Sequence, residues 1–134
     1  MTTNSVYIGA ESLITPLGNT VTSNWKALLA GQSGIKKWAE RGWNKVDVYL
    51  SAFQQESVPT FTDLVIQALT ATIEQLHIAS VVQSKRTLVI ISSTKGDVSG
   101  DLTQTFQPTV DTVKERFELH HTPIVLSNAC VSGI

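Results

Sequence analysis

The chain has 134 residues, of which 42% are hydrophobic and 16% charged, and this length is sufficient for one globular domain with a real core. Its formal net charge is −1, and the ten basic and eleven acidic residues are scattered, so no stretch resembles a surface that binds nucleic acid or anionic lipid. A single cysteine excludes an internal disulfide and any pair of cysteines at metal-ligand spacing.

The sequence gives no sign of a membrane or secreted protein. Its start, "MTTNSVYIGA", has no basic region followed by an apolar one, so we expect no signal peptide. The longest apolar run, "LVII" at 88–91, is far too short to span a bilayer. We therefore expect a cytoplasmic protein without membrane or nucleic-acid partners.

The first predicted elements are a strand at 6–10 ("VYIGA"), a turn within "LITPLGN" and a helix over "TSNWKALLAG". Thr22 or Ser23 is the expected N-cap of this helix, and Gly31 the expected stop. The large apolar residues of the helix share one face: Trp25, Leu28 and Leu29.

The next stretch, 32–59, has aromatic residues without sustained periodicity, and we expect an irregular excursion with short elements. The clearest helix follows at 61–78, with Asp63 in its first turn. It has one wide apolar stripe, formed by Phe61, Leu64, Val65, Ala68, Leu69, Ile73 and Leu76.

The last third of the chain predicts two more strands and a helix. "TLVIISS" at 87–93 is a continuous apolar strand of the kind buried on both faces of a parallel sheet. A polar loop at 94–101 leads to a helix at roughly 108–119 that starts at Pro108, and "TPIVLSNA" at 122–129 is the final strand.

This order of elements predicts an α/β architecture with a mainly parallel sheet flanked by helices. The sheet is expected to contain 6–10, 87–93 and 122–129, with the helix at 61–78 on one face. A flavodoxin-like or Rossmann-like sheet is the generic alternative, but "STKGDVSG" fits neither G-x-G-x-x-G nor G-x-x-x-x-G-K-(S/T).

Cys130 follows the last predicted strand among small residues, in "SNACVSGI". A thiol on a tight strand-to-helix turn lies at a helix N-terminus, where backbone N–H groups favour the thiolate and can hold an oxyanion. The structural alternative is a small buried cysteine packed under the sheet, and the local sequence leaves both open.

Three segments resemble the β-ketoacyl-acyl carrier protein synthases. "VYIGAESLITPLGNTVTSNWKALLAGQSGI" is similar to their opening strand, "TPLG" turn, Trp-containing helix and "LLAGxSGI" segment. "LVIISSTKGD" resembles their second core strand with an altered Gly-rich ending, and "PIVLSNACVSGI" resembles the strand and turn that hold the acyl-accepting cysteine. The resemblance covers nearly the whole chain and is weakest at 36–59.

The resemblance implies a thiolase-like fold, of which residues 1–134 form the first part of the N-terminal half. It implies that Cys130 takes an acyl group from the phosphopantetheine thioester of an acyl carrier protein, with its own backbone N–H as one oxyanion donor, and that no further cofactor is needed. In the family, two histidines and a lysine from the second half complete the site. The chain alone is therefore expected to lack condensing activity.

The histidines of this chain are not expected to replace them. His120 and His121 precede the last strand, about a strand length from the thiol, and are expected to be solvated at a helix end. His77 has the same interpretation, and no partner residues at ligand spacing suggest a metal. Lys95 and Asp97 are expected to belong to a solvated loop.

Three functions remain open from the sequence. The first is a condensing acyltransferase of fatty acid, polyketide or polyene biosynthesis, whose segment 95–121 is shorter than usual, so that the acyl chain is undefined. The second is a non-catalytic synthase-like subunit that shapes the pocket of an active partner, although Cys130 argues against it. The third is a generic α/β binding domain with a passive thiol. In each case we expect association, as a homodimer or with the complementary C-terminal part or synthase partner, because open sheet edges invite pairing.

Overall fold

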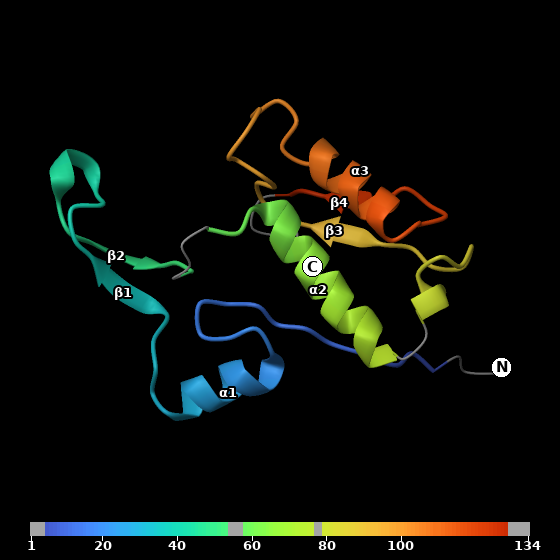
Figure 1. Ribbon diagram of the computed structural model, residues 1–134, viewed down its shortest axis with the longest axis horizontal. Coiled ribbons are helices and arrows are strands. Elements are labelled where there is room, and N and C mark those ends of the chain that lie inside the picture. The colour runs from blue at the N-terminus through green and yellow to red at the C-terminus, as the bar shows by residue number, and fades with distance from the viewer. Residues whose placement is uncertain (1–4, 54–57, 77–78, 129–134) are drawn as a thin grey trace. The chain divides into compact units, whose positions relative to one another are not determined.

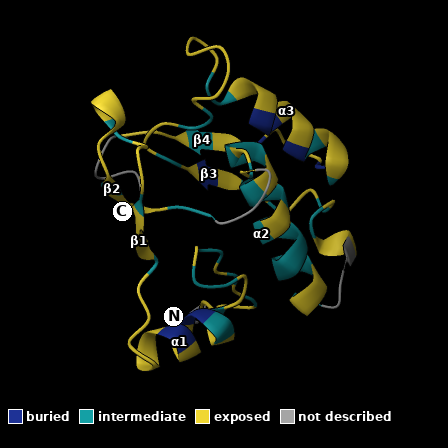
Figure 2. Cartoon of the chain, turned by 60° about the vertical axis from the view of Figure 1, so that its left-hand side comes forward, coloured by how far each residue is buried: buried dark blue, intermediate teal, exposed yellow. Residues whose placement is uncertain are grey.

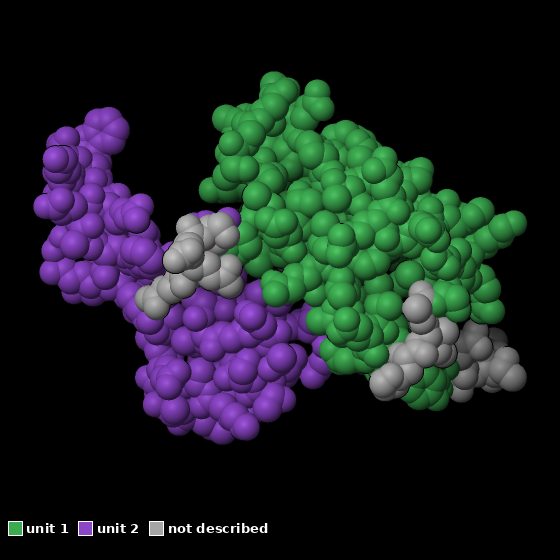
Figure 3. All heavy atoms as spheres, in the orientation of Figure 1, with its two compact units in different colours: residues 1–10, 59–134 green, residues 11–58 purple. Residues whose placement is uncertain are grey.

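The computed structural model describes residues 5–53, 58–76 and 79–128 and divides the chain into two compact units. One unit comprises residues 11–58, and the other comprises residues 1–10 and 59–134 (Figure 3). The expectation of one domain over 1–134 stays a prediction.

In the unit of residues 11–58, helix α1 (Val21–Leu29) has well-defined ends. It begins with a capping box, in which Ser23 N–H donates to the Thr20 hydroxyl at 3.0 Å and Thr20 N–H donates to the Ser23 hydroxyl at 3.1 Å. The N-cap is therefore Thr20, and the predicted caps Thr22 and Ser23 are wrong, because both lie inside the helix and Ser23 is its third residue. The helix ends at Leu29 with Ala30 as its C-cap, and Gly31, the predicted stop, follows with a φ of 68°, the left-handed conformation that follows many helices.

Asn24 is the buried polar side chain of α1, with only 3% of its surface exposed. Its amide nitrogen donates to the carbonyl oxygens of Leu13, Gly18 and Thr20 at 3.3, 2.9 and 2.8 Å, and its amide oxygen accepts from the Thr15 hydroxyl. These bonds fasten the turn of residues 13–20 onto the helix, because one buried side chain joins four groups of the turn.

The apolar face of α1 is not its buried face. Trp25, Leu28 and Leu29 share a face as predicted, but they are 60%, 57% and 71% exposed. The buried side of α1 consists instead of Asn24 and Ala27. The hydrogen bonds of Asn24, rather than the apolar stripe, therefore determine which side of α1 faces inward.

Strands β1 (Ile35–Trp38) and β2 (Val48–Ser51) form an antiparallel hairpin, with Ile35 opposite Ser51 and Trp38 opposite Val48. A short 3-10 helix, η1 (Trp43–Lys45), lies in the connection. The prediction of short elements in the excursion is thus confirmed.

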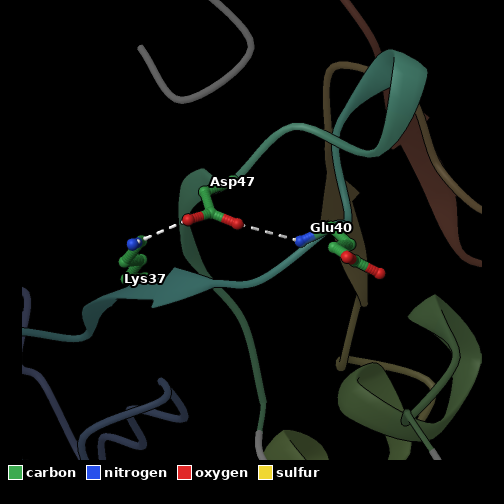
Figure 4. A network of polar contacts seen from close by, with 3 residues as sticks. All are labelled: Lys37, Glu40 and Asp47. Atoms are coloured by element: carbon green, nitrogen blue, oxygen red, sulfur yellow. Dashed lines mark hydrogen bonds and ion pairs between the residues drawn. The ribbon is translucent and has the colours of Figure 1, made fainter.

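A polar network ties the two ends of this connection together. The Asp47 carboxylate forms an ion pair with the Lys37 ammonium at 2.7 Å and accepts from Glu40 N–H at 3.1 Å (Figure 4). The Lys37 contact and then the Glu40 N–H hold the pKa of Asp47 below its ordinary value, so its carboxyl stays charged to a lower pH than that of an isolated aspartate. Glu40 has a positive φ of 54°, and its bond to Asp47 helps to hold that conformation.

The other unit contains α2 (Phe61–Leu76), the 3-10 helix η2 (Ala79–Val81), β3 (Ile90–Ser92), α3 (Gln107–Arg116) and β4 (Ile124–Leu126). Both helices lie beside the β3–β4 pair (Figures 1 and 2).

Helix α2 begins after a second capping box, in which Thr60 N–H donates to the Asp63 carboxylate at 2.9 Å and Asp63 N–H donates to the Thr60 hydroxyl at 3.1 Å. These contacts lower the pKa of Asp63, first through the Thr60 N–H and then through its hydroxyl. The predicted end of this helix at 77–78 lies outside the described residues.

Strands β3 and β4 are parallel, with Ile90 opposite Ile124, Ile91 opposite Val125 and Ser92 opposite Leu126. This pairing confirms a parallel sheet, although both strands are shorter than predicted. Only one face of the pair is covered, since Ile91 is 6% exposed whereas Ile90 is 54% and Ile124 45% exposed. The expectation that 87–93 is buried on both faces is therefore wrong for the described residues.

The predicted strand at 6–10 is also wrong. These residues form no strand, and Val6, Tyr7 and Ile8 are almost fully exposed. The segment contacts the end of α2, because a Cβ on Gly9 would stand 3.1 Å from Leu76 Cδ2. A β-rich sequence becomes a strand only when a partner strand accepts its hydrogen bonds, and none of the described segments does so here.

The core of this unit lies where α3 packs against α2. Val113 and Thr109 of α3 are completely buried and Val110 is 5% exposed, as the dark face of α3 in Figure 2 shows. The Thr62 and Thr109 hydroxyls are hydrogen-bonded at 2.7 Å, which satisfies the polar group that α3 buries. Helix α2 has no fully buried residue, so its predicted stripe is only half covered.

We expect Asn24→Ala to lower the free energy of unfolding by about 1–3 kcal/mol, because it removes the hydrogen bonds that the buried amide forms with three carbonyl oxygens and with the Thr15 hydroxyl. Urea denaturation followed by tryptophan fluorescence measures this, since Trp25 is the next residue of the helix. Lys26→Ala, an exposed change on the same helix, is the control and should shift stability by less than about 0.5 kcal/mol. Equal losses in the two variants would contradict the role assigned to Asn24.

Candidate functional site

The candidate site is the carboxyl edge of the β3–β4 pair. In a parallel pair the carboxyl ends of both strands meet at one edge. Ser93, the residue after β3, donates its N–H to the Leu126 carbonyl at 3.1 Å and so extends the pairing to that edge. Two segments leave from here: the loop of residues 93–106, and the run from Ser127 toward Cys130.

Cys130, the predicted nucleophile, lies outside the described residues. The last described residues of its run are Ser127 and Asn128, both exposed. Its placement and surroundings therefore stay predictions.

The loop of residues 93–106 is fixed by its own hydrogen bonds. The Ser93 hydroxyl accepts from Gly96 N–H at 3.1 Å, and Asp97 N–H donates to the Thr105 carbonyl at 2.8 Å. Gly96 has a φ of 68°, and a Cβ there would stand 2.5 Å from the Thr105 oxygen. Only glycine fits this position. Any other residue would be strained at this positive φ, and its Cβ would clash with the opposite side of the loop.

Both carboxylates of the loop serve local turns. Asp97 accepts from Ser99 N–H at 2.9 Å, and Asp101 accepts from the N–H and hydroxyl of Thr103 at 2.9 and 2.7 Å. Hydroxyl and then N–H donation lowers the pKa of each carboxyl, because both hydrogen bonds favour the charged form. This agrees with a structural role for Asp97. Lys95 is exposed, as expected for a solvated loop.

Neither described histidine reaches the carboxyl edge. His120 and His121 stand before β4, at the amino edge of the pair, with their rings 4.7 Å apart and perpendicular. The Nε2 atom of His121 lies 2.9 Å from the Lys85 carbonyl, which precedes β3. Both side chains are exposed, so the prediction of a solvated pair opposite the cysteine end of the strand is confirmed. His77 lies outside the described residues.

Sequence reasoning missed Ser93, whose hydroxyl organises the loop at the edge. The available signal was a serine followed three residues later by glycine directly after a strand, a pattern typical of side-chain-capped turns. A hollow of about 360 Å³ at the far end of the loop is lined by residues 103–107, none of which is a nucleophile or a base near neutral pH.

Residues 5–53, 58–76 and 79–128 contain neither a cluster of metal ligands nor a membrane-spanning helix. That part of the chain contains no group of three or more His, Cys, Asp or Glu side chains that could hold a metal ion. No helix within it combines the length and the apolar character needed to cross a membrane.

We expect Gly96→Ala to disrupt the 93–106 loop and to cost about 1–3 kcal/mol of stability, because the added methyl group meets the Thr105 carbonyl at a positive φ. Gly100→Ala is a matched control in the same loop, since nothing lies within 4 Å of a Cβ at that position. Thermal unfolding and amide exchange of Asp97 measure the two effects. Indistinguishable variants would refute the described loop geometry.

Comparison with known proteins finds a short similarity to one class of enzyme. The chain is 54% identical over 35 residues to 3-oxoacyl-(acyl-carrier-protein) synthase 2 of Vibrio cholerae, and 51% identical over 35 residues to the enzyme of the same name from Vibrio harveyi. Each match covers 26% of this chain and 8% of the relative, so the chain matches only a small part of those enzymes. No protein-family profile and no solved structure matches the chain. What the comparisons establish is a local resemblance to a 3-oxoacyl-(acyl-carrier-protein) synthase.

Proposed function

We propose that this chain is the N-terminal portion of a 3-oxoacyl-acyl carrier protein synthase-like condensing enzyme, in which Cys130 accepts the acyl group. The observation that carries the proposal is the parallel β3–β4 pair, whose second strand ends at Leu126, four residues before the cysteine. The local similarity to synthases that bear this name supports it.

The chemistry proposed for Cys130 is a thioester exchange. Its thiolate attacks the carbonyl carbon of an acyl group held on the phosphopantetheine of an acyl carrier protein. The carbon–sulfur bond to phosphopantetheine then breaks, and the released thiolate takes up a proton. A thiol at the start of a helix suits this step, because backbone N–H groups stabilise both the thiolate and the oxyanion of the tetrahedral intermediate.

The second half-reaction needs groups that the described residues do not provide at this edge. Decarboxylative condensation with a malonyl thioester calls for proton donors or acceptors near the thiol, and His120 and His121 are at the other edge. In this proposal those groups come from the second half of a thiolase-like fold. The exposed face of the β3–β4 pair, with Ile90 and Ile124, is consistent with a further layer that covers it.

We expect the chain to become acylated on Cys130 when it is incubated with an acyl-acyl carrier protein or a simpler acyl thioester, because the proposed position at the start of a helix favours the thiolate. Mass spectrometry of the peptide that contains Cys130 measures the rate, with Cys130→Ser as the blank. A short synthetic peptide with the same sequence is the reference for an unactivated thiol. Acylation no faster than that of the peptide would refute an activated nucleophile and would favour a non-catalytic partner subunit.

A further inference from the structure

The fold gathers stretches that are far apart in the sequence at the amino edge of the β3–β4 pair. The Nε2 atom of His121, before β4, lies 2.9 Å from the carbonyl oxygen of Lys85, before β3. The side-chain amide of Gln83 donates to the Glu118 carboxylate at 2.8 Å, which ties the same stretch to the residues after α3. The two stretches therefore lie side by side beyond the amino ends of the strands (Figure 1).

Three cations belong to this edge. The ammonium of Lys114 donates to the Thr122 hydroxyl at 2.9 Å, and Thr122 directly follows His121 in the sequence. Lys85 contacts His121 through its carbonyl group, and Arg86 is the next residue; both are exposed. We call Lys85, Arg86 and Lys114 the amino-edge cations. The sequence does not reveal this group, because β3 and the 93–106 loop separate its members.

The amino-edge cations are not neutralised by carboxylates. Among the described residues, the ion pair is that of Lys37 with Asp47, in the other unit. The carboxylate tied to this edge, that of Glu118, accepts from the uncharged amide of Gln83 instead. Three positive charges are thus available to an anion at this edge.

The opposite edge of the pair has the opposite sign. The 93–106 loop, at the carboxyl edge, contains one cation, Lys95, and two carboxylates, Asp97 and Asp101. The charges therefore differ between the two edges, although the net charge of the whole chain is only −1. An anion should be attracted to the amino edge and repelled from the carboxyl edge.

We propose that the amino-edge cations bind a small anion with two linked phosphate groups, the chemistry shared by inorganic pyrophosphate and a nucleoside diphosphate. The planar guanidinium of Arg86 can donate two parallel hydrogen bonds to phosphate oxygens, and the two lysines add point charges. Three cations in one place fit a compact ligand, whereas the extended backbone of a nucleic acid requires a row of them. This inference does not depend on the acyl chemistry of Cys130.

The exposure of the amino-edge cations sets the strength of binding. Contacts between exposed charges each contribute little, and salt screens them. We expect a dissociation constant on the order of 0.1–1 mM for pyrophosphate at low ionic strength. Added salt should weaken the binding.

NMR titration of the isotope-labelled chain with pyrophosphate, and separately with ADP, tests the proposal. The amide signals of residues 83–86 and 114–122 should shift, and those of the 93–106 loop should not. Inorganic phosphate should bind more weakly than pyrophosphate, because it offers fewer charged oxygens to the three cations. The tighter of the two diphosphate probes identifies which source of this chemistry the edge prefers.

Three variants locate the binding. Lys85→Gln combined with Arg86→Gln should raise the dissociation constant about tenfold, whereas Lys95→Gln, the matched loss of charge at the opposite edge, should leave it unchanged. Glu118→Gln should lower the dissociation constant about two- to fivefold, because it removes a negative charge while its amide oxygen can still accept from Gln83. Such a gain cannot result from a loss of folding.

Four results would overturn the proposal. The first is a titration with pyrophosphate that shifts no signal at 83–86 or 114–122. The second is a loss of binding in Lys95→Gln as large as that in the double variant, and the third is a Glu118→Gln variant that binds no more tightly than the wild type. The fourth is tighter binding of a single-stranded oligonucleotide than of pyrophosphate at equal phosphate concentration, which would assign the edge to nucleic acid.

Discussion

The parallel pairing of β3 with β4 is the constraint on which the candidate site depends. It joins only three residues of each strand, but those strands are separated in sequence by the whole of the 93–106 loop and α3. Because the strands are parallel, residues that follow β3 and β4 lie at one edge of the pair, and residues that precede them lie at the other. The loop with Ser93 and Gly96 and the run toward Cys130 start at the carboxyl edge, and the two histidines stand at the amino edge. An antiparallel pairing would instead have placed the histidines beside the start of the 93–106 loop and the run toward Cys130 at the opposite edge.

Local hydrogen bonds define the helices more sharply than the apolar patterns do. Both α1 and α2 begin with a threonine that exchanges hydrogen bonds with the residue three positions later, Ser23 or Asp63. After α3, Glu118 adopts the left-handed conformation that Gly31 adopts after α1. The next residue, Leu119, is buried. These short-range features explain why the sequence predicts all three helices to within a few residues.

Features that depend on distant partners were predicted less well. The segment 6–10 has the composition of a strand, but its pairing depends on a neighbour that its own residues do not specify. The apolar periodicity of α1 does not predict its buried side. That side is set by Asn24, whose three carbonyl partners belong to the preceding turn, and the spacing of apolar residues carries no information about the shape of that turn. For the candidate site, the sequence predicts the order of strand, loop and cysteine and the separation of the histidines. The hydroxyl of Ser93 and the fit around Gly96 emerge only from the folded loop.

The central claim is that Cys130 and the 93–106 loop share one edge of the parallel pair, and a crosslinking measurement tests it directly. The chain has a single thiol, and Lys95 lies in that loop. Lys85 and Lys114 lie toward the amino edge instead. Lys114 donates there to the Thr122 hydroxyl at 2.9 Å. A short reagent that reacts with the thiol first and then with an amine should join Cys130 mainly to Lys95. This preference should disappear in urea and in a Lys95→Arg variant. Preferential crosslinking to Lys85 or Lys114 in the folded chain would contradict the account.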